Sequence, residues 1–237
     1  MGSEDFIKGK YRYCLWLKDA PPGELRKMPE VMKRIEAVRD FRLNSVKAAT
    51  RAAADYPSRF MEIKQPETDY LMVPAVSSEK RKYAPIGYLS KNVVAANTAS
   101  YVSDVSPYHF GVLTSSVHMA WMRTVCGRLE MRYRYSAAIV YNNFPWPSFA
   151  KATEDEPDAA SSEIEKTAQG ILDARALYPD SSLADLYDPL TMPPELRKAH
   201  TANDAAVLKA YGWPADLSES EIVARLFDRY AKLTNEL

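Results

Sequence analysis

The sequence predicts an α+β fold, in which a mixed β-sheet with packed helices over residues 10–150 precedes a small all-helical part over residues 160–237. Short apolar runs separated by Pro, Ser, Asp and Asn fill residues 60–105, as in strands joined by turns. Helical periodicity with capping signals dominates the end of the chain. The acidic stretch 151–162 (KATEDEPDAASS) between these parts predicts a domain boundary.

Size and composition indicate a soluble globular protein. Its 237 residues are 46% hydrophobic and 26% charged, which is ordinary for this class. No apolar run is long enough to span a membrane, and the first residues lack the apolar stretch of a signal peptide. Cys14 and Cys126 lie far apart and fit neither a disulfide framework nor a metal-binding pattern. We therefore expect a reduced protein in the cytoplasm.

The net charge of zero conceals a split along the chain. Residues 1–150 carry 22 Lys and Arg against 14 Asp and Glu, a net charge of +8. Residues 151–237 carry 9 against 17, a net charge of −8. The basic part suits a polyanion such as nucleic acid, whereas the acidic part would be repelled from one.

Two elements are expected before residue 60. Residues 11–17 (YRYCLWL) are aromatic and apolar and predict a buried strand. Residues 29–54 predict a helix with an apolar stripe of Met32, Ile35 and Val38, continued by Phe41 and Val46. The rest of this helix carries the basic residues Lys33, Arg34, Arg39, Arg42, Lys47 and Arg51. Such a face is either solvated surface or a track for phosphates.

A strand-rich section follows. The expected strands are 60–63, 70–76, 83–89, 93–96 and 101–105, and they predict an antiparallel or mixed sheet. Hydroxyls and cations gather between the second and third strands, at Ser77, Ser78, Lys80, Arg81 and Lys82. This segment is either a polar hairpin tip or a place for phosphate contacts.

Residues 107–125 predict one apolar helix, which Gly127 ends as a left-handed C-terminal residue would. His109 and His118 lie in this segment with a spacing unsuited to joint metal binding, so we expect them to be structural.

The next strand alternates charged and aromatic side chains. Glu130, Arg132 and Arg134 are expected on one face, and Met131, Tyr133 and Tyr135 on the other, against a core. Arginine pairs bidentately with guanine, and glutamate accepts from the cytosine amino group, so such a strand can read base edges. The alternative is a solvated edge strand in which Glu and Arg pair with each other.

The pattern at the end of the chain predicts a small helical bundle. Capping boxes at Ser162-x-x-Glu165 and Ser218-x-x-Glu221 predict two helix starts. A short helical segment is expected at 182–187, and a helix runs from Pro193-Pro194 to Tyr211, with Gly212 as its stop.

Catalytic motifs are scarce. There is no glycine-rich nucleotide loop, no Gly-x-Ser-x-Gly elbow and no triad-like histidine pattern. Asp55, Glu62 and Lys64 match the loose Asp…Glu-x-Lys spacing of metal-dependent nucleases, in which two carboxylates hold Mg²⁺. A nuclease using these residues is therefore the alternative function.

Several stretches together resemble a known family. They are WLKDAPPGELRKMPEVMKRIEAVRDFR, VPAVSSEKRKYAPIGYL, FGVLTSSVHMAWMRTVCGRLEMRYRYS, VYNNFPWP and SLADLYDPLTMPPELRKAH. In this order they resemble the C-terminal portion of the MmeI-like (Type IIL) restriction–modification enzymes and their DNA methyltransferase relatives. The resemblance runs from about residue 10 to the end.

In that family one polypeptide carries a nuclease, a helical connector, an S-adenosylmethionine-dependent adenine methyltransferase, a target recognition domain and a helical tail. This chain resembles only the last two, and it contains neither the cofactor-binding glycine motif nor the Asn-Pro-Pro-Tyr-type catalytic motif. The resemblance implies a fragment that by itself neither methylates nor cuts DNA and holds no cofactor. S-adenosylmethionine is expected in the methyltransferase domain of the parent enzyme.

The resemblance also implies roles for individual residues. Glu130 and Arg132 fall where family members read one G·C pair, and Arg134 falls where they read a neighbouring position. Asn97 is the candidate for adenine, since Asn bonds adenine bidentately. The segment with Ser77, Ser78, Lys80 and Arg81 resembles a constant element that contacts the DNA backbone.

The expected partners are double-stranded DNA and the methyltransferase domain of the parent polypeptide, whose target adenine is flipped out for modification. The acidic tail is expected to pack on protein as a capping bundle without a ligand of its own. A protein-interaction module that binds no DNA is a third interpretation.

Overall fold

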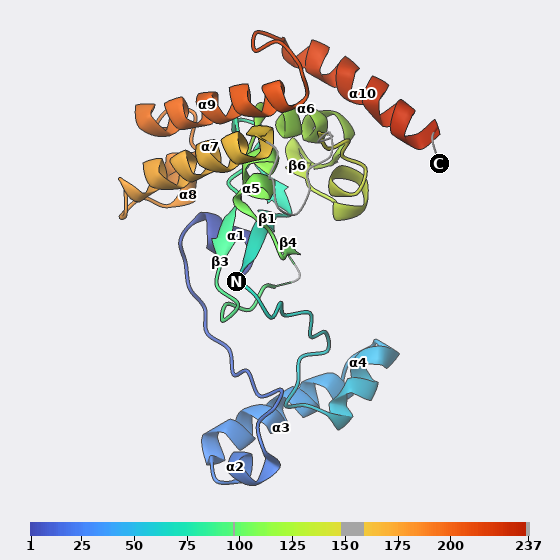
Figure 1. Ribbon diagram of the computed structural model, residues 1–237. Helices are drawn as coiled ribbons and strands as arrows, with labels where there is room; N and C mark the ends of the chain where they lie inside the picture. Colours follow the sequence, from blue (N-terminus) through green and yellow to red (C-terminus); the bar gives the residue numbers. More distant parts are fainter. Residues whose placement is uncertain (97, 148–158, 236–237) are drawn as a thin grey trace. The chain divides into compact units, whose positions relative to one another are not determined.

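The computed structural model describes residues 1–96, 98–147 and 159–235 (Figure 1). Its contacts divide the chain into two compact units. The smaller unit is Arg12–Gln65, and the larger one combines Met1–Tyr11 with Pro66–Leu237. The units are described separately.

The smaller unit is helical and is held together by a buried arginine. Its elements are α2 (Pro22–Arg26), α3 (Pro29–Leu43), α4 (Ala48–Ala52) and the 3₁₀ turn η1 (Ala53–Asp55). The guanidinium of Arg42 donates to the carbonyl oxygens of Ala53 at 2.8 Å, Tyr56 at 3.1 Å and Arg59 at 2.7 Å. Because these carbonyls all belong to the segment that follows α4, Arg42 fixes the return of the chain towards α3.

Several predictions for this unit are wrong. Residues 11–17 form no strand, and Tyr13 is 95% exposed. The helix predicted over 29–54 is interrupted between α3 and α4, and its stripe is exposed except at Ile35, with Phe41 at 76%. Residues 60–63 also form no strand. Trp16 and Phe60 of these segments stack with their ring centres 5.5 Å apart, yet both remain partly open to solvent, so apolar character alone did not bury the segments.

The larger unit contains a first antiparallel sheet of order β3-β1-β4. Its strands are β1 (Tyr70–Pro74), β3 (Gly87–Leu89) and β4 (Ala99–Ser103), and Leu71 pairs with both Tyr88 and Val102. The short helix α1 (Ser3–Ile7) packs on β1 through Phe6, Ile7 and Met72. Residues 93–96 form no strand, contrary to prediction, and the backbone hydrogen bonds of Val94 and Ala96 go to the single residue Met1.

A second antiparallel sheet has the order β2-β6-β5 and consists of β2 (Val76–Ser77), β6 (Arg132–Arg134) and β5 (Gly127–Leu129). The chain leaves the first sheet after Pro74 and enters the second at Val76, while the carbonyl of Ala75 accepts from the Tyr135 N–H at 2.9 Å. The predicted α+β class is confirmed. The described strands form two small antiparallel sheets instead of one mixed sheet.

The apolar segment 107–125 forms two helices, α5 (Pro107–Leu113) and α6 (Ser116–Val125), instead of the single helix predicted. The break arises because the Ser115 side chain caps α6 by accepting from the His118 N–H at 3.3 Å. Gly127 is not a left-handed helix end. It begins β5 after an extended Cys126, and a π-helical turn, η2 (Ala137–Tyr141), follows the second sheet.

Four helices complete the described chain: α7 (Ala159–Ala176), α8 (Leu183–Leu186), α9 (Pro194–Ala210) and α10 (Glu219–Asn235). Gly212 follows α9 with φ 68° and is its stop, as predicted. The capping box at α10 is confirmed, since Ser218 N–H donates to Glu221 at 2.8 Å and Glu221 N–H to the Ser218 hydroxyl at 3.4 Å. Ser162 lies inside α7 and does not cap it.

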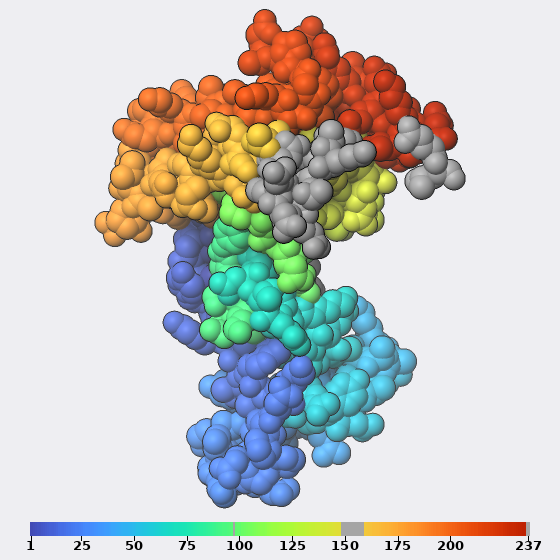
Figure 2. Space-filling view, viewed as in Figure 1, coloured from blue at the N-terminus to red at the C-terminus, as the bar shows by residue number. Residues whose placement is uncertain are grey.

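The hydrophobic core of the larger unit draws on residues from both sides of 151–162, among them Phe110, Ile164 and Val207. Helices α7 and α9 pack side by side, and both contact α5 (the yellow and orange helices of Figure 2). The helical end of the chain is therefore built into the same core as the sheets.

Among the glycines of the described residues, Gly111 leaves the least room for a Cβ, and we expect Gly111→Ala to destabilise the chain by about 1–3 kcal/mol. A Cβ there would lie 2.6 Å from Ile164 Cγ2 and 3.1 Å from Ala168 Cβ. Urea unfolding measures the loss. Gly170→Ala is the control, because a Cβ at Gly170 meets nothing within 4 Å and alanine favours the helix. Equal effects of the two substitutions would contradict the close packing of α5 on α7.

Candidate functional site

The charged residues of the second sheet lie on a hairpin. Strands β5 and β6 are joined by the two-residue turn Glu130–Met131, and Glu130 has a positive φ of 56°. Positive φ is characteristic of the turns that close two-residue hairpins. Glu130 therefore sits in the turn, not on the strand face where it was predicted, while Arg132 and Arg134 are in β6 as predicted.

Cross-strand pairing fixes which side chains share a face. Leu129 pairs with Arg132, Gly127 with Arg134, and Arg128 with Tyr133. Since directly paired residues point to the same side, Arg132, Arg134 and Leu129 share one face, and all three are exposed. The hairpin thus presents two guanidinium groups on one open face, beside the carboxylate in its turn.

Glu130 and Arg132 interact directly. Nη2 of Arg132 lies 2.8 Å from Oε2 of Glu130. The Arg132 side chain is 47% exposed and the Glu130 side chain is 77% exposed. An exposed pair of this kind contributes little to stability, so either group can exchange its partner for a ligand at small cost. The alternative interpretation was a solvated edge strand with this pairing. The pairing is present, but β6 is the central strand of its sheet, and the pairing is compatible with base reading.

The opposite face anchors the hairpin to the core. Tyr133 and Tyr135 are buried as predicted, whereas Met131 is 71% exposed because it lies in the turn. The Tyr135 hydroxyl lies 3.2 Å from Nε2 of His118, which is fully buried in α6. Burial lowers the pKa of His118 to about 3 and raises that of Tyr135. His118 is therefore a neutral core residue.

The segment predicted to contact the DNA backbone begins beside this hairpin. Strand β2 pairs with β6, with Ser77 opposite Tyr133, so the following loop lies next to the charged strand. Lys80 is exposed, and Ser78 and Arg81 are partly exposed, whereas Ser77 is buried. Burial lowers the pKa of Arg81, which nearby Asp188 partly offsets. The loop thus offers cations beside the hairpin.

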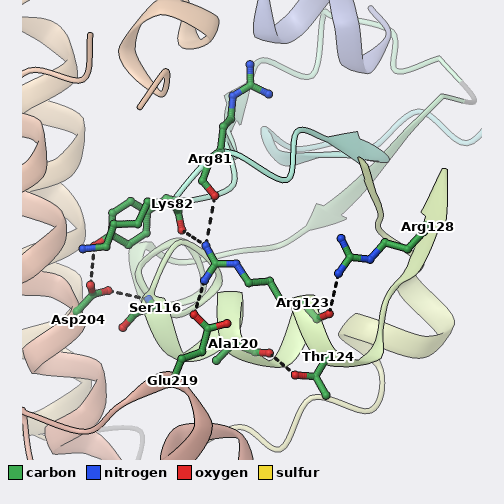
Figure 3. Close-up of polar contacts among 10 residues, drawn as sticks. Arg81, Lys82, Ser116, Ala120, Arg123, Thr124, Arg128, Asp204 and Glu219 are labelled. Carbon is green, nitrogen blue, oxygen red and sulfur yellow. Dashed lines mark hydrogen bonds and ion pairs between the residues drawn. The ribbon is translucent and has the colours of Figure 1, made fainter. Parts of the chain in front are cut away.

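Arg123 and Arg128 were not singled out by the sequence, yet they hold this region together (Figure 3). The Arg128 guanidinium lies 4.1 Å from the centre of the Tyr133 ring and donates to the Met131 carbonyl at 3.2 Å. Arg123 donates to the Lys82 carbonyl at 3.1 Å. A signal existed for Arg123, since it is a lone cation near the end of an apolar helix.

The remaining candidates are not assembled into a site. Glu62 and Lys64 form an ion pair of 3.1 Å in an exposed segment without strands, and Asp55 ends η1. In the part of the chain that the structure describes, no three His, Cys, Asp or Glu side chains are grouped to hold a metal ion. Asn97 lies outside the described residues.

No helix among the described residues is long and apolar enough to cross a membrane.

Family comparisons divide the chain in two. Residues 1–148 match the family described as MmeI, target recognition domain, and residues 156–237 match MmeI, C-terminal domain.

Two relatives extend this finding. The chain is 35% identical over 234 residues to DNA methyltransferase A of Bacillus subtilis (strain 168). The match covers 99% of this chain and 26% of that protein. The chain is also similar to the solved structure of the Type IIL restriction–modification enzyme MmeI in complex with DNA, with a TM-score of 0.91 and 46% identity. That match covers 99% of this chain and 30% of the other. The chain thus spans less than a third of either relative.

Proposed function

Because this chain belongs to the MmeI family of target recognition and C-terminal domains, we propose that it is a sequence-specific recognition module for double-stranded DNA. In this proposal it positions a methyltransferase domain, carried elsewhere in a longer polypeptide, over the adenine to be modified. The solved relative was determined in complex with DNA, and the curated relative is named a DNA methyltransferase, which supports the assignment.

The observation that carries the proposal is the exposed face of the β5–β6 hairpin. Arg132 and Arg134 point from it side by side, and the hairpin is rigidly backed by buried Tyr133 and Tyr135. A two-stranded ribbon fits the major groove, where arginine recognises guanine and glutamate recognises cytosine. Glu130 and Arg132 together would read one G·C pair, and Arg134 a neighbouring position.

Other groups would supply sequence-independent affinity. Lys80 and Arg81 lie on the loop beside the hairpin and suit phosphate oxygens. Ser78 is the hydroxyl candidate there, while burial makes Ser77 the weakest of the four. On the smaller unit, Arg34 and Arg39 of α3 are exposed, whereas Arg42 is committed to backbone carbonyls. Asn97 stays the candidate for adenine.

The proposal assigns no catalysis to this chain alone. Methyl transfer would take place in the methyltransferase domain of the parent enzyme, which would hold S-adenosylmethionine, and the cytoplasm would be the site of action. The nuclease alternative has no support from the placement of Asp55, Glu62 and Lys64.

Selection from a randomised duplex pool at modest salt tests the proposal. The wild-type chain should enrich one motif, and Arg132→Ala should lose about 1–3 kcal/mol of discrimination at a single base pair. Lys80→Ala should instead weaken binding to all sequences and lower the salt slope by about one.

Enrichment of no motif by the wild type would refute DNA recognition by this chain. Binding that is indifferent to salt would favour a protein-interaction module.

A further inference from the structure

Arg123 lies where three parts of the larger unit meet (Figure 3). Its Nη1 is 2.7 Å from Oε2 of Glu219, the first residue of α10. Its Nη2 donates to the carbonyl oxygens of Arg81 at 3.3 Å and Lys82 at 3.1 Å. The Arg123 side chain is 23% exposed and that of Glu219 is 53% exposed, so the arginine is largely shielded from solvent while the carboxylate is open to it.

The loop that ends at Tyr83 is held from a second side. Asp204 of α9 accepts from the Tyr83 hydroxyl at 2.6 Å and from the Ser116 N–H, at the start of α6, at 2.7 Å. Burial raises the pKa of Asp204, and these two hydrogen bonds act in the opposite direction. Two carboxylates from the helical end of the chain, Asp204 and Glu219, therefore converge on residues 81–83 and on α6.

The same arginine reaches the hairpin through its own backbone. The Arg123 carbonyl accepts from Arg128 Nη2 at 3.5 Å, and Arg128 Nη1 holds the Met131 carbonyl in the turn. The Arg128 guanidinium also stacks on Tyr133 in β6. A continuous series of polar contacts thus runs from Glu219 to the turn that carries Glu130.

We infer that the C-terminal helical part is a positioning element for DNA recognition, and that Glu219 acts through Arg123 to hold the 78–83 loop and the β5–β6 hairpin in their binding arrangement. This rests on the proposed function. Both terminal nitrogens of Arg123 are engaged by acceptors within the chain, so its role is to orient other groups. Ordering the loop before binding lowers the entropy cost of association.

The role differs from that of a merely structural ion pair. A structural pair changes global stability and leaves the local order of the loop in the folded state unaltered. A positioning pair changes the local opening of the loop and the affinity for DNA, with little effect on global unfolding.

Glu219→Gln removes the charge with nearly the same shape, and Asp228→Asn is its control, because it makes the same charge change at an exposed position on the same helix. Amide hydrogen exchange of the whole chain is the first readout. Glu219→Gln should speed exchange at residues 78–83 and 129–132 about 3- to 10-fold, with the melting temperature unchanged, and Asp228→Asn should not.

Binding to the duplex that the wild type selects is the second readout, and Glu219→Gln should weaken it by about 3- to 10-fold. Arg123→Lys, which keeps a charge near Glu219 but loses the forked donors, should behave in the same way.

Unchanged exchange in Glu219→Gln would overturn the inference. Faster exchange with unchanged affinity would also overturn it and would leave the proposed function standing. A wild type that selects no duplex would refute the proposed function itself, and exchange would then decide alone whether Glu219 orders the loop.

Discussion

Exchanging the charges of the turn and strand, by Glu130→Lys together with Arg132→Asp, should invert one G·C pair of the recognised motif and leave the other positions unchanged. In the wild type, arginine would take the guanine and glutamate the cytosine of the same pair. Lysine also donates to guanine, and aspartate also accepts from cytosine. Exchanging the charges therefore changes which DNA strand carries the preferred guanine. We expect discrimination at that pair to change sign, by about 10- to 100-fold in each direction.

The geometry favours a folded double variant. Residues 130 and 132 approach within 2.8 Å as an ion pair, and the exchange preserves that pair with opposite polarity. Both sites are exposed, so the substitution leaves the core untouched. The measurement is selection by the wild type and the variant from the same randomised pool.

A matched control lies in the same chain. Glu62 and Lys64 are also two residues apart, exposed and paired, at 3.1 Å. Glu62→Lys with Lys64→Asp should leave the motif unchanged. If the hairpin exchange also leaves it unchanged, Glu130 and Arg132 do not read bases.

The second large effect is loss of stability in acid. Burial lowers the pKa of His118 to about 3 and that of His200 well below its ordinary value. A histidine with a depressed pKa in the folded state contributes stability that is present above about pH 6.5 and is lost as pH falls towards the folded-state pKa. For His118 the loss should be about 2 kcal/mol between pH 7 and pH 5.

His200 adds a loss of the same sign. It lies between Tyr83, whose ring is stacked at 4.0 Å, and the Tyr187 hydroxyl at 2.8 Å, and the positive charge of Arg175 further disfavours its protonation. Asp204 works in the opposite direction, because its raised pKa contributes stability below its unfolded pKa that is lost as pH rises. Between pH 7 and pH 5 two histidine losses of one sign oppose a single aspartate, so we expect a net loss of stability as the pH falls.

Urea unfolding between pH 7 and pH 5 measures this loss. His118→Gln should flatten the dependence by about one proton, because glutamine can still meet the Tyr135 hydroxyl but does not titrate. An unchanged pH dependence in this variant would contradict a neutral, buried His118.

The features that the sequence predicted correctly carry short-range signals. The stop at Gly212 and the capping box of Ser218 with Glu221 depend on a few adjacent residues, and both are present in the structure. The buried side of the hairpin, Tyr133 and Tyr135, follows from strict alternation. In each case one local rule was enough.

The errors arose where the outcome depends on what lies opposite. The stripe of Met32, Val38 and Phe41 has helical spacing, but spacing does not specify a covering layer, and within the described unit the stripe stays exposed. Arg42 was counted as a surface cation and is instead buried among backbone carbonyls. Nothing in the local sequence marks the distant acceptors that make this possible.

The candidate site was half predicted. Arg132 and Arg134 share a face because β6 alternates as expected, but the turn at Glu130 lacks the Asn or Gly that usually marks a two-residue hairpin. Arg123 contacts Arg81, which is 42 positions away in the sequence, and Glu219, which is 96 positions away. Alternation and helical periodicity cannot reveal such distant pairs.

The backbone conformation at Glu130 limits which side chains can replace it in the hairpin turn. A φ of 56° is open to glycine, asparagine and aspartate at low cost and to unbranched side chains at moderate cost, but it penalises valine, isoleucine and threonine. Backbone strain will therefore disfavour some substitutions at residue 130, independently of any contact with DNA. Under the proposed base reading, new specificities should be accessible through Lys, Gln, Asn or Asp at residue 130, because this φ limits which side chains the turn accepts.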